Sequence, residues 1–254
     1  LLDHLNYREY IDLALKEYPE REGLEHGVTD CFGRSINHVY RMSEGDLHEL
    51  FSIGLSSFDL RNIRTILIAH KRGIPFHEIR HVLIPCQTLT RAGIEASYIA
   101  GNTQDLLQNL TTCCPLVTLA IRAALNDKRE DEPVVDLINR LEQNLYNNIF
   151  RRLDSSDEDA RILKNVYRYE VDLKNIVSSL KHIWRRAASK QGMERYIRGG
   201  TLTENFLHDL MNAKNLDEAF EMIETTEYHE AVETGVIYYA ETGFLHEMER
   251  SEEH

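Results

Sequence analysis

The sequence predicts an all-α protein on three observations. The 254-residue chain contains only five prolines, so long tracts run without the residue that most often breaks a helix. Within these tracts apolar residues recur three and four positions apart, which is the spacing of one helix face. Strict alternation of apolar and polar residues, the pattern of a half-buried strand, is absent from the sequence. Hydrophobic residues make up 42% of the chain, which is typical of a folded globular protein.

Apolar stripes of helical spacing occur along the whole chain. In chain order they are Leu60, Ile63 and Leu67; Leu137, Leu141, Leu145 and Ile149; and Leu207, Leu210 and Met211. Clusters of Gly, Pro, Asn and Asp between such tracts predict loops. The predicted loops are residues 23–30, 101–102 and 127–133.

An internal repeat organises the chain. The string DLRNI begins at Asp59 and DLKNI at Asp172, while TLT begins at Thr88 and again at Thr201. The two copies of each string are the same number of residues apart. This repeat offset, which carries position 59 onto position 172, also aligns further apolar positions on either side. A period of this length is too long for a solenoid, so it indicates copies of a several-helix module. We therefore expect duplicated multi-helix modules: a first over 1–113, a second over 114–226 and the beginning of a third over 227–254.

The repeated Asp and Asn residues are the candidate functional residues. Asp59 precedes an apolar stripe, so we expect its carboxylate to cap the start of a helix. Asn62 and Arg64 lie off that stripe and are free to hydrogen-bond a neighbouring helix. Asp172 and Asn175 repeat this placement. A polar pair at equivalent points of two modules indicates an architectural role, because an active site is rarely needed twice.

The last threonine of each TLT string predicts a helix start. Thr90 and Thr203 each precede a further apolar stripe. Threonine is favoured at the N-cap of a helix because its hydroxyl accepts a hydrogen bond from a backbone N–H of the first turn. This structural demand explains both residues, so we assign them no catalytic role.

One motif raises the alternative of a zinc hydrolase. Residues 77–81 read HEIRH, which matches H-E-x-x-H, where two histidines one turn apart bind zinc and the glutamate acts as base. Pro75 places the motif at the beginning of a helix and not within one. The repeat maps the three motif residues onto side chains that do not form such a site, so we considered and rejected a metal site. The residues concerned are His77, Glu78 and His81, which map onto Lys190, Gln191 and Glu194.

Composition and missing motifs exclude several classes of function. The formal net charge of -13 opposes non-specific binding to nucleic acid and adsorption to anionic lipid. No stretch approaches the roughly 18–20 apolar residues of a membrane span, so we expect no direct membrane insertion. Phosphate-loop, dinucleotide-binding and nucleophile-elbow patterns are missing, and we expect no cofactor and no catalytic residue. The four cysteines include no CxxC pair, so we expect reduced thiols in a cytoplasmic protein.

The segment from Asp59 to Thr90 resembles the C subunit of archaeal and bacterial A/V-type ATP synthases, a family whose eukaryotic member is the d subunit of vacuolar ATPases. That family carries D-[VI]-x-N-[IL]-[KR], followed by L-[IL]-P-x-G-x-L. The first pattern is filled by Asp59, Asn62 and Arg64, the second includes Pro85, and the next copy keeps Asp172 and Asn175. The sequence departs from the pattern at Gln87, where glycine is common.

The resemblance implies a funnel of three similar helical modules that performs no chemistry. Such a protein would be a rotor adaptor, which transmits torque for ion transport coupled to ATP synthesis or hydrolysis. Its partners would be the membrane rotor ring and the central stalk subunits D and F, with no nucleic acid. The ring would hold it, as a peripheral protein, at the cytoplasmic face of the membrane.

Two alternatives stay open from the residues alone. A generic helical-repeat scaffold fits the duplication, and a zinc metallopeptidase would rest on His77, Glu78 and His81. The chain opens on Leu1 instead of Met and stops in a charged run, so we expect truncation at both ends and most of a third module to be missing.

Overall fold

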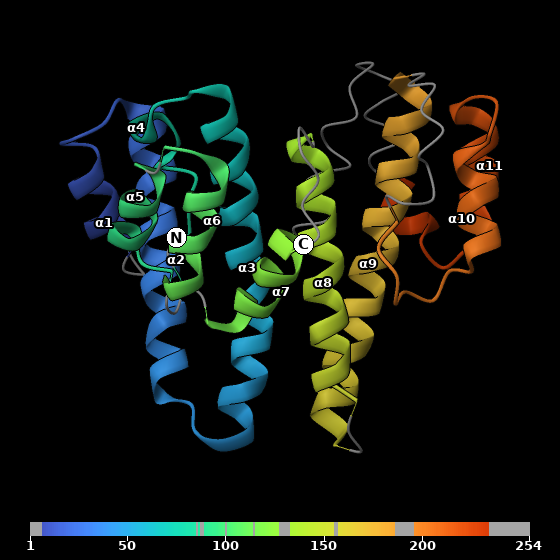
Figure 1. The fold of residues 1–254 in the computed structure, drawn as a ribbon, viewed down its shortest axis with the longest axis horizontal. Helices are drawn as coiled ribbons and strands as arrows, with labels where there is room; N and C mark the ends of the chain where they lie inside the picture. The colour runs from blue at the N-terminus through green and yellow to red at the C-terminus, as the bar shows by residue number, and fades with distance from the viewer. Residues whose placement is uncertain are drawn as a thin grey trace. The chain divides into compact units, whose positions relative to one another are not determined.

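The computed structural model describes residues 7–84, 86, 89–99, 101–113, 115–126, 133–154, 157–185 and 196–233. Within these ranges all regular secondary structure is helical, which confirms the predicted all-α class (Figure 1). The chain divides into two compact units, residues 1–149 and residues 150–254. The predicted module boundaries near residues 113 and 226 stay predictions, because a compact unit and a sequence repeat need not begin at the same residue.

The first unit is built around two long antiparallel helices joined by a short turn. Its helices are α1 (Tyr7–Ala14), α2 (Glu20–Met42), α3 (Gly45–Arg72), α4 (Phe76–Ile79), α5 (Arg91–Tyr98), α6 (Thr103–Cys113), α7 (Pro115–Asn126) and α8 (Val134–Arg152), the last of which crosses the boundary between the units. Helix α1 packs on α2, whereas α6 packs on α5 and α7 and also contacts α3 (Figure 1). The predicted stripe of Leu60, Ile63 and Leu67 is buried, as is the stripe from Leu137 to Ile149.

The second unit packs two short helices against one long one. Helix α9 (Glu158–Arg185) contacts α10 (Glu204–Met211) and α11 (Leu216–Glu224). Their shared core includes Ile176 and Leu180 from α9, Leu210 from α10 and Ile223 from α11. The chain then returns to this core at Tyr228 and Val232, so the described part of the unit ends in contact with α9.

Helix bounds repeat along the chain with the offset seen in the sequence. Helices α3 and α9 both have 28 residues, and α5 and α10 both have eight. The first residues of each pair, Gly45 with Glu158 and Arg91 with Glu204, are separated by the repeat offset. The matching lengths support the inference that one helical plan occurs twice.

The predicted loop over residues 23–30 is wrong, because these residues lie within α2. Their two glycines are explained by packing and not by a turn. A Cβ atom at Gly27 would lie 2.6 Å from the Cα of Ile11, and one at Gly23 would lie 2.8 Å from Cδ2 of Leu15. The glycines therefore let α2 approach the α1 region closely at a small cost in helix propensity.

Other local expectations have mixed outcomes. Residues 101–102 form a bend before α6, as predicted, whereas residues 127–132 lie outside the described ranges. Cys31 and Cys86 are buried free thiols. Among the described residues, no helix is both long enough and apolar enough to cross a bilayer.

Candidate functional site

Asp172 anchors a loop to the middle of α9. The residue is 0% exposed, yet its carboxylate accepts four hydrogen bonds. Oδ2 accepts from the Thr201 amide at 2.5 Å, the Thr201 hydroxyl at 2.8 Å and the Tyr228 hydroxyl at 2.7 Å. Oδ1 accepts from the Leu202 amide at 3.2 Å. These donors replace the water that the carboxylate loses on burial, which would otherwise be costly.

Glycine at position 200 makes this close approach possible. A Cβ atom there would lie 2.0 Å from Oδ1 of Asp172, far inside van der Waals contact. The preceding Gly199 has a φ of +117°, and a Cβ atom on it would lie 2.2 Å from Phe150. Both glycines are therefore required by the loop. The sequence showed them only as a double glycine before a TLT string.

The Asn of each motif holds a chain segment by two hydrogen bonds. Asn175 donates from Nδ2 to the Ile197 carbonyl at 2.9 Å, and its Oδ1 accepts from the Ile197 amide at 2.9 Å. Asn62 does the same with Ile84, at 2.6 Å and 3.0 Å. Both asparagines are buried, at 2% and 1% exposure. The two motifs therefore make the same clamp, each on a residue 22 positions downstream.

Asp59 has a different environment from Asp172. It is also 0% exposed, but among the residues that the structure describes none donates a hydrogen bond to either carboxylate oxygen. Burial raises the pKa of Asp59 to about 8. Burial, together with the nearby Asp59 charge, also raises the pKa of the Cys86 thiol to about 12. The first motif therefore holds a carboxyl group that is mainly protonated at neutral pH.

The expectation that these aspartates cap the start of their own helices is wrong. Asp59 lies well inside α3, and Asp172 lies in the middle of α9. Asp172 instead binds backbone N–H groups of a distant loop, a role that needs tertiary structure. Arg64 lies off the apolar face, as expected, with a side chain 53% exposed and its Nη1 3.9 Å from Oε1 of Glu142. Pro85 lies outside the described residues.

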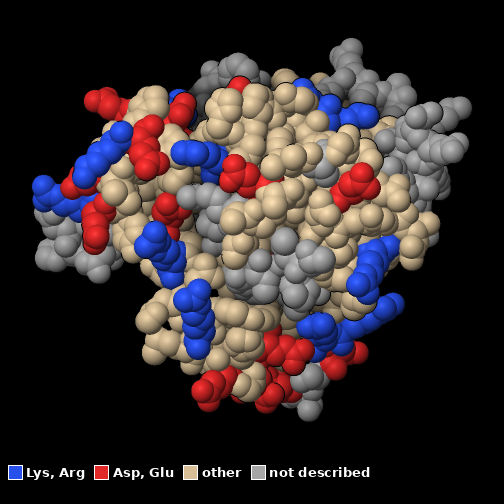
Figure 2. Space-filling view, turned by 60° about the vertical axis from the view of Figure 1, so that its left-hand side comes forward, with Lys and Arg blue, Asp and Glu red and all other residues tan. Residues whose placement is uncertain are grey.

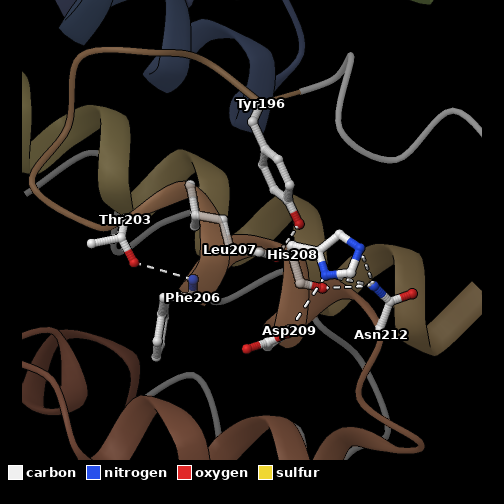
Figure 3. Close-up of polar contacts among 7 residues, drawn as sticks. All are labelled: Tyr196, Thr203, Phe206, Leu207, His208, Asp209 and Asn212. Carbon is white, nitrogen blue, oxygen red and sulfur yellow. Dashed lines mark hydrogen bonds and ion pairs between the residues drawn. The ribbon is translucent and has the colours of Figure 1, made fainter.

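The predicted threonine caps are confirmed in both copies. The Thr90 hydroxyl accepts from the Gly93 amide at 3.2 Å, and the Thr203 hydroxyl accepts from the Phe206 amide at 3.2 Å (Figure 3). The same close-up shows the Tyr196 hydroxyl, which donates to the Leu207 carbonyl at 2.6 Å. The loop between α9 and α10 is thus fastened to both helices.

A second pair of caps was missed in the sequence. Asn102 accepts from the Asp105 amide and Asn215 from the Glu218 amide, both at 2.9 Å. The repeat offset carries the first of these asparagines onto the second, and asparagine is a preferred N-cap residue. That offset, read together with cap preference, was the signal that could have identified them.

The HEIRH motif does not form a zinc-binding helix in this structure. Helix α4 has only four residues and begins after Pro75, as the sequence indicated. His77 lies in α4, but His81 follows the end of the helix, and its Nε2 lies 4.0 Å from Oε2 of Glu25. Arg80 stacks its guanidinium 4.6 Å from the ring centre of Tyr18. In the described part of the chain, no group of three or more His, Cys, Asp or Glu side chains is arranged to hold a metal ion.

Charged side chains of both signs are interspersed on the face drawn in Figure 2, with tan areas of other residues between them. That face therefore has no extended basic area of the kind that binds phosphate backbones. Together with the clamped loops, this defines the class of the molecule: its described part is all-helical, and its buried Asn62, Asn175 and Asp172 side chains hold distant segments of the chain in place.

Comparison with known proteins identifies the family. The sequence model of the ATP synthase (C/AC39) subunit family matches residues 1–253, so the chain belongs to this family. Relatives named as the C subunit of A-type ATP synthase include that of Methanosphaera stadtmanae, 24% identical over 95% of this chain and 60% of the relative. Those of Haloquadratum walsbyi and Methanothermobacter thermautotrophicus are 20% and 24% identical; the alignments cover 98% and 96% of this chain and 77% and 61% of the relatives. The chain thus spans about 60% of the length of the first and third relatives.

Proposed function

We propose that this chain is the non-catalytic rotor adaptor of an A-type or V-type rotary ATPase. In this role it links the central stalk to the membrane rotor ring and transmits torque between them. The observation that carries the proposal is the family match, which extends over residues 1–253 and not over one motif. Catalysis in such a complex belongs to other subunits.

The buried clamps suit a part that transmits force. Asn62 and Asn175 each fix a distant segment to a long helix by a pair of hydrogen bonds, and Asp172 fixes a further loop. Such contacts join helices and loops into close-packed bodies, and close-packed interiors are stiff and transmit strain. A stiff body passes rotation on with little loss to internal deformation.

The proposed partners are the membrane rotor ring and the stalk subunits D and F. We further propose that the ring holds the protein, as a peripheral component, at the cytoplasmic face of the membrane. The net charge of -13 supports attachment through protein, because anionic lipid repels an acidic surface.

Co-sedimentation with the purified rotor ring and, separately, with the D–F pair tests the proposal. We expect saturable binding to at least one of them at moderate salt, unchanged by a chelator. The heat-denatured chain is the control for non-specific association. Failure of the folded chain to bind either would overturn the adaptor role and favour a generic helical scaffold. Stoichiometric zinc, with binding or activity lost in chelator, would instead favour the metallopeptidase.

A longer chain that includes a complete third module sharpens the test. We expect it to bind the D–F pair more tightly than residues 1–254, because three modules would enclose a socket that two leave open. Equal affinity of the two chains would show that the third module contributes nothing to this interface.

A further inference from the structure

Helix α9 carries an exposed apolar stripe over its N-terminal half, on the face that continues into its core residues Leu173 and Ile176. Ile162 and Val166 are each 56% exposed and Tyr169 is 39% exposed, although all three are large apolar side chains. They are four and three residues apart, so they line one side of the helix. The other side is buried through Ala160, Tyr167 and Val171. A helix that is apolar on two faces is expected to have a second element packed against it.

The first copy supports this expectation. By the repeat offset, Val166 and Tyr169 correspond to Ile53 and Ser56 of α3. Those two residues are 1% and 0% exposed, so this part of the equivalent face of α3 is covered, whereas Glu49, which corresponds to Ile162, is exposed. The exposed stripe on α9 is therefore a position at which the second copy lacks a covering element among the described residues.

The last described residues of the chain approach this stripe. The ring of Tyr228 lies 4.9 Å from that of Tyr169, centre to centre, and its hydroxyl donates to Asp172 one turn further along α9. Val232 is 3% exposed and belongs to the same core, and residues 229–233 are helical. The described chain thus ends, in a helix, next to the C-terminal end of the stripe.

The following segment, residues 234–254, has the composition of a partner for this face. Its apolar residues recur at helical spacing: Val236, Tyr239, Ala240, Phe244 and Met248. Its acidic residues are Glu241, Glu247, Glu249, Glu252 and Glu253. Helix α9 places Arg161, Lys164 and Arg168 one turn apart on a neighbouring face. Arg161 already lies 3.6 Å from Glu158, and Lys164 lies 3.2 Å from Asp154. An acidic amphipathic helix laid on the stripe would therefore add carboxylates beside existing ion pairs.

We propose that the stripe of Ile162, Val166 and Tyr169 is the docking face for the chain's own segment 234–254. The contact of Tyr228 with Tyr169 brings the chain to the stripe shortly before this segment begins. This proposal is independent of the adaptor role, because it concerns only residues 150–254.

Hydrogen–deuterium exchange of the 254-residue chain tests the proposal. We expect residues 234–250 to be protected in the unaltered protein. In the double variant I162K/V166K their exchange should accelerate about tenfold or more, which corresponds to a loss of about 1.4 kcal/mol of docking free energy. Both positions are more than half exposed, so the variant should fold, and circular dichroism checks that it does. The matched control is Ile99→Lys, since Ile99 is 80% exposed and lies in the other unit.

Several outcomes would overturn the proposal. One is a segment 234–250 that exchanges freely in the unaltered chain, and another is protection that the double variant leaves intact. Concentration-dependent self-association that disappears in the double variant would assign the stripe to a second copy. Loss of D–F binding with unchanged exchange in the segment would assign it to the stalk.

Discussion

The two Asp-Asn motifs make the same contacts through their asparagine but differ in the surroundings of their aspartate. In both, the asparagine clamps the backbone of a residue 22 positions downstream with two hydrogen bonds. In the second motif the aspartate also accepts four hydrogen bonds, whereas Asp59 accepts none from the described residues. The same short string therefore contains a buried carboxylate with hydrogen-bond donors in one place, and in the other a buried carboxyl group that accepts no hydrogen bond from the described residues.

The difference follows from residues outside the motif. Gly200 lets the loop approach Asp172, whereas the first copy has Gln87, a residue with a Cβ atom, at the equivalent position of the sequence. Tyr228 supplies a hydroxyl to Asp172, and the corresponding residue in the first copy is Pro115, which has none. The motif thus supplies a buried carboxyl group, while the residues packed against that group determine whether it is charged.

The largest expected effect comes from Asp172→Asn. The replacement keeps the shape but converts one acceptor oxygen into an NH2 donor, which then faces backbone or hydroxyl donors. We expect the free energy of unfolding of the second unit to fall by about 4 kcal/mol, since several hydrogen bonds to a charged group are lost together. Urea unfolding followed by fluorescence of Trp184, the single tryptophan, reports on α9 directly.

Asp59→Asn is the matched control for this variant. Because Asp59 must take up a proton on folding and the amide of Asn needs none, we expect no loss of stability at pH 7 but a gain of up to about 4 kcal/mol in the first unit, measured by circular dichroism. A loss as large as that of Asp172→Asn would show that the two carboxyl groups are equally engaged, against the comparison drawn above.

The next effect in size is that of Gly200→Ala. The new methyl group would meet Oδ1 of Asp172 at 2.0 Å, so the loop must retreat and lose hydrogen bonds to the carboxylate. We expect a loss of about 3 kcal/mol by urea unfolding. Gly101→Ala is the control, because a Cβ atom at Gly101 would meet nothing within 4 Å. An unchanged stability of Gly200→Ala would mean that the loop does not depend on this contact.

The pH dependence of stability should arise from the first copy. The pKa of Asp59 is raised from 3.8 to about 8 in the folded chain, so the folded state binds a proton that the unfolded state releases. The free energy of unfolding should therefore fall as pH rises from about 4 to about 8 and then level off. At about 1.4 kcal/mol per pH unit, the loss between pH 6 and pH 8 is about 2 kcal/mol. Urea titrations of the first unit at both values measure it, and in Asp59→Asn this contribution should vanish.

The smallest expected effect is that of Tyr228→Phe. The variant keeps the buried ring and removes one donor to Asp172, whose other three hydrogen bonds remain. We expect a loss of about 1.5 kcal/mol, the value of one hydrogen bond to a charged group. The control is Tyr169→Phe, which alters a partly exposed tyrosine of α9 and should change stability by less than about 0.5 kcal/mol.

Features set by local sequence were predictable. The stripe of Leu60, Ile63 and Leu67 has helical spacing and is buried, because periodicity alone decides which face of a helix is apolar. Thr90 and Thr203 cap helices because an N-cap depends on residues within one turn.

Features set by distant parts of the chain were not predictable. The glycines of residues 23–30 looked like a loop, but they permit close packing of α2 on the α1 region. Asp59 and Asp172 looked like helix caps, but both lie inside long helices, and the partners of Asp172 are 29 to 56 residues away. No local pattern encodes which loop returns to a buried carboxylate.

The titration of the Asp59 carboxyl group tests the difference between the two copies most directly. Carbon-13 NMR of the side-chain carboxyl from pH 4 to pH 10, assigned with Asp59→Asn, reports its protonation without reference to stability. We predict a midpoint near pH 8, as expected for a buried carboxyl group that accepts no hydrogen bond from the residues described in the structure. A midpoint near or below the ordinary carboxyl value would show that donors or water reach Asp59, and the asymmetry between the copies would be contradicted.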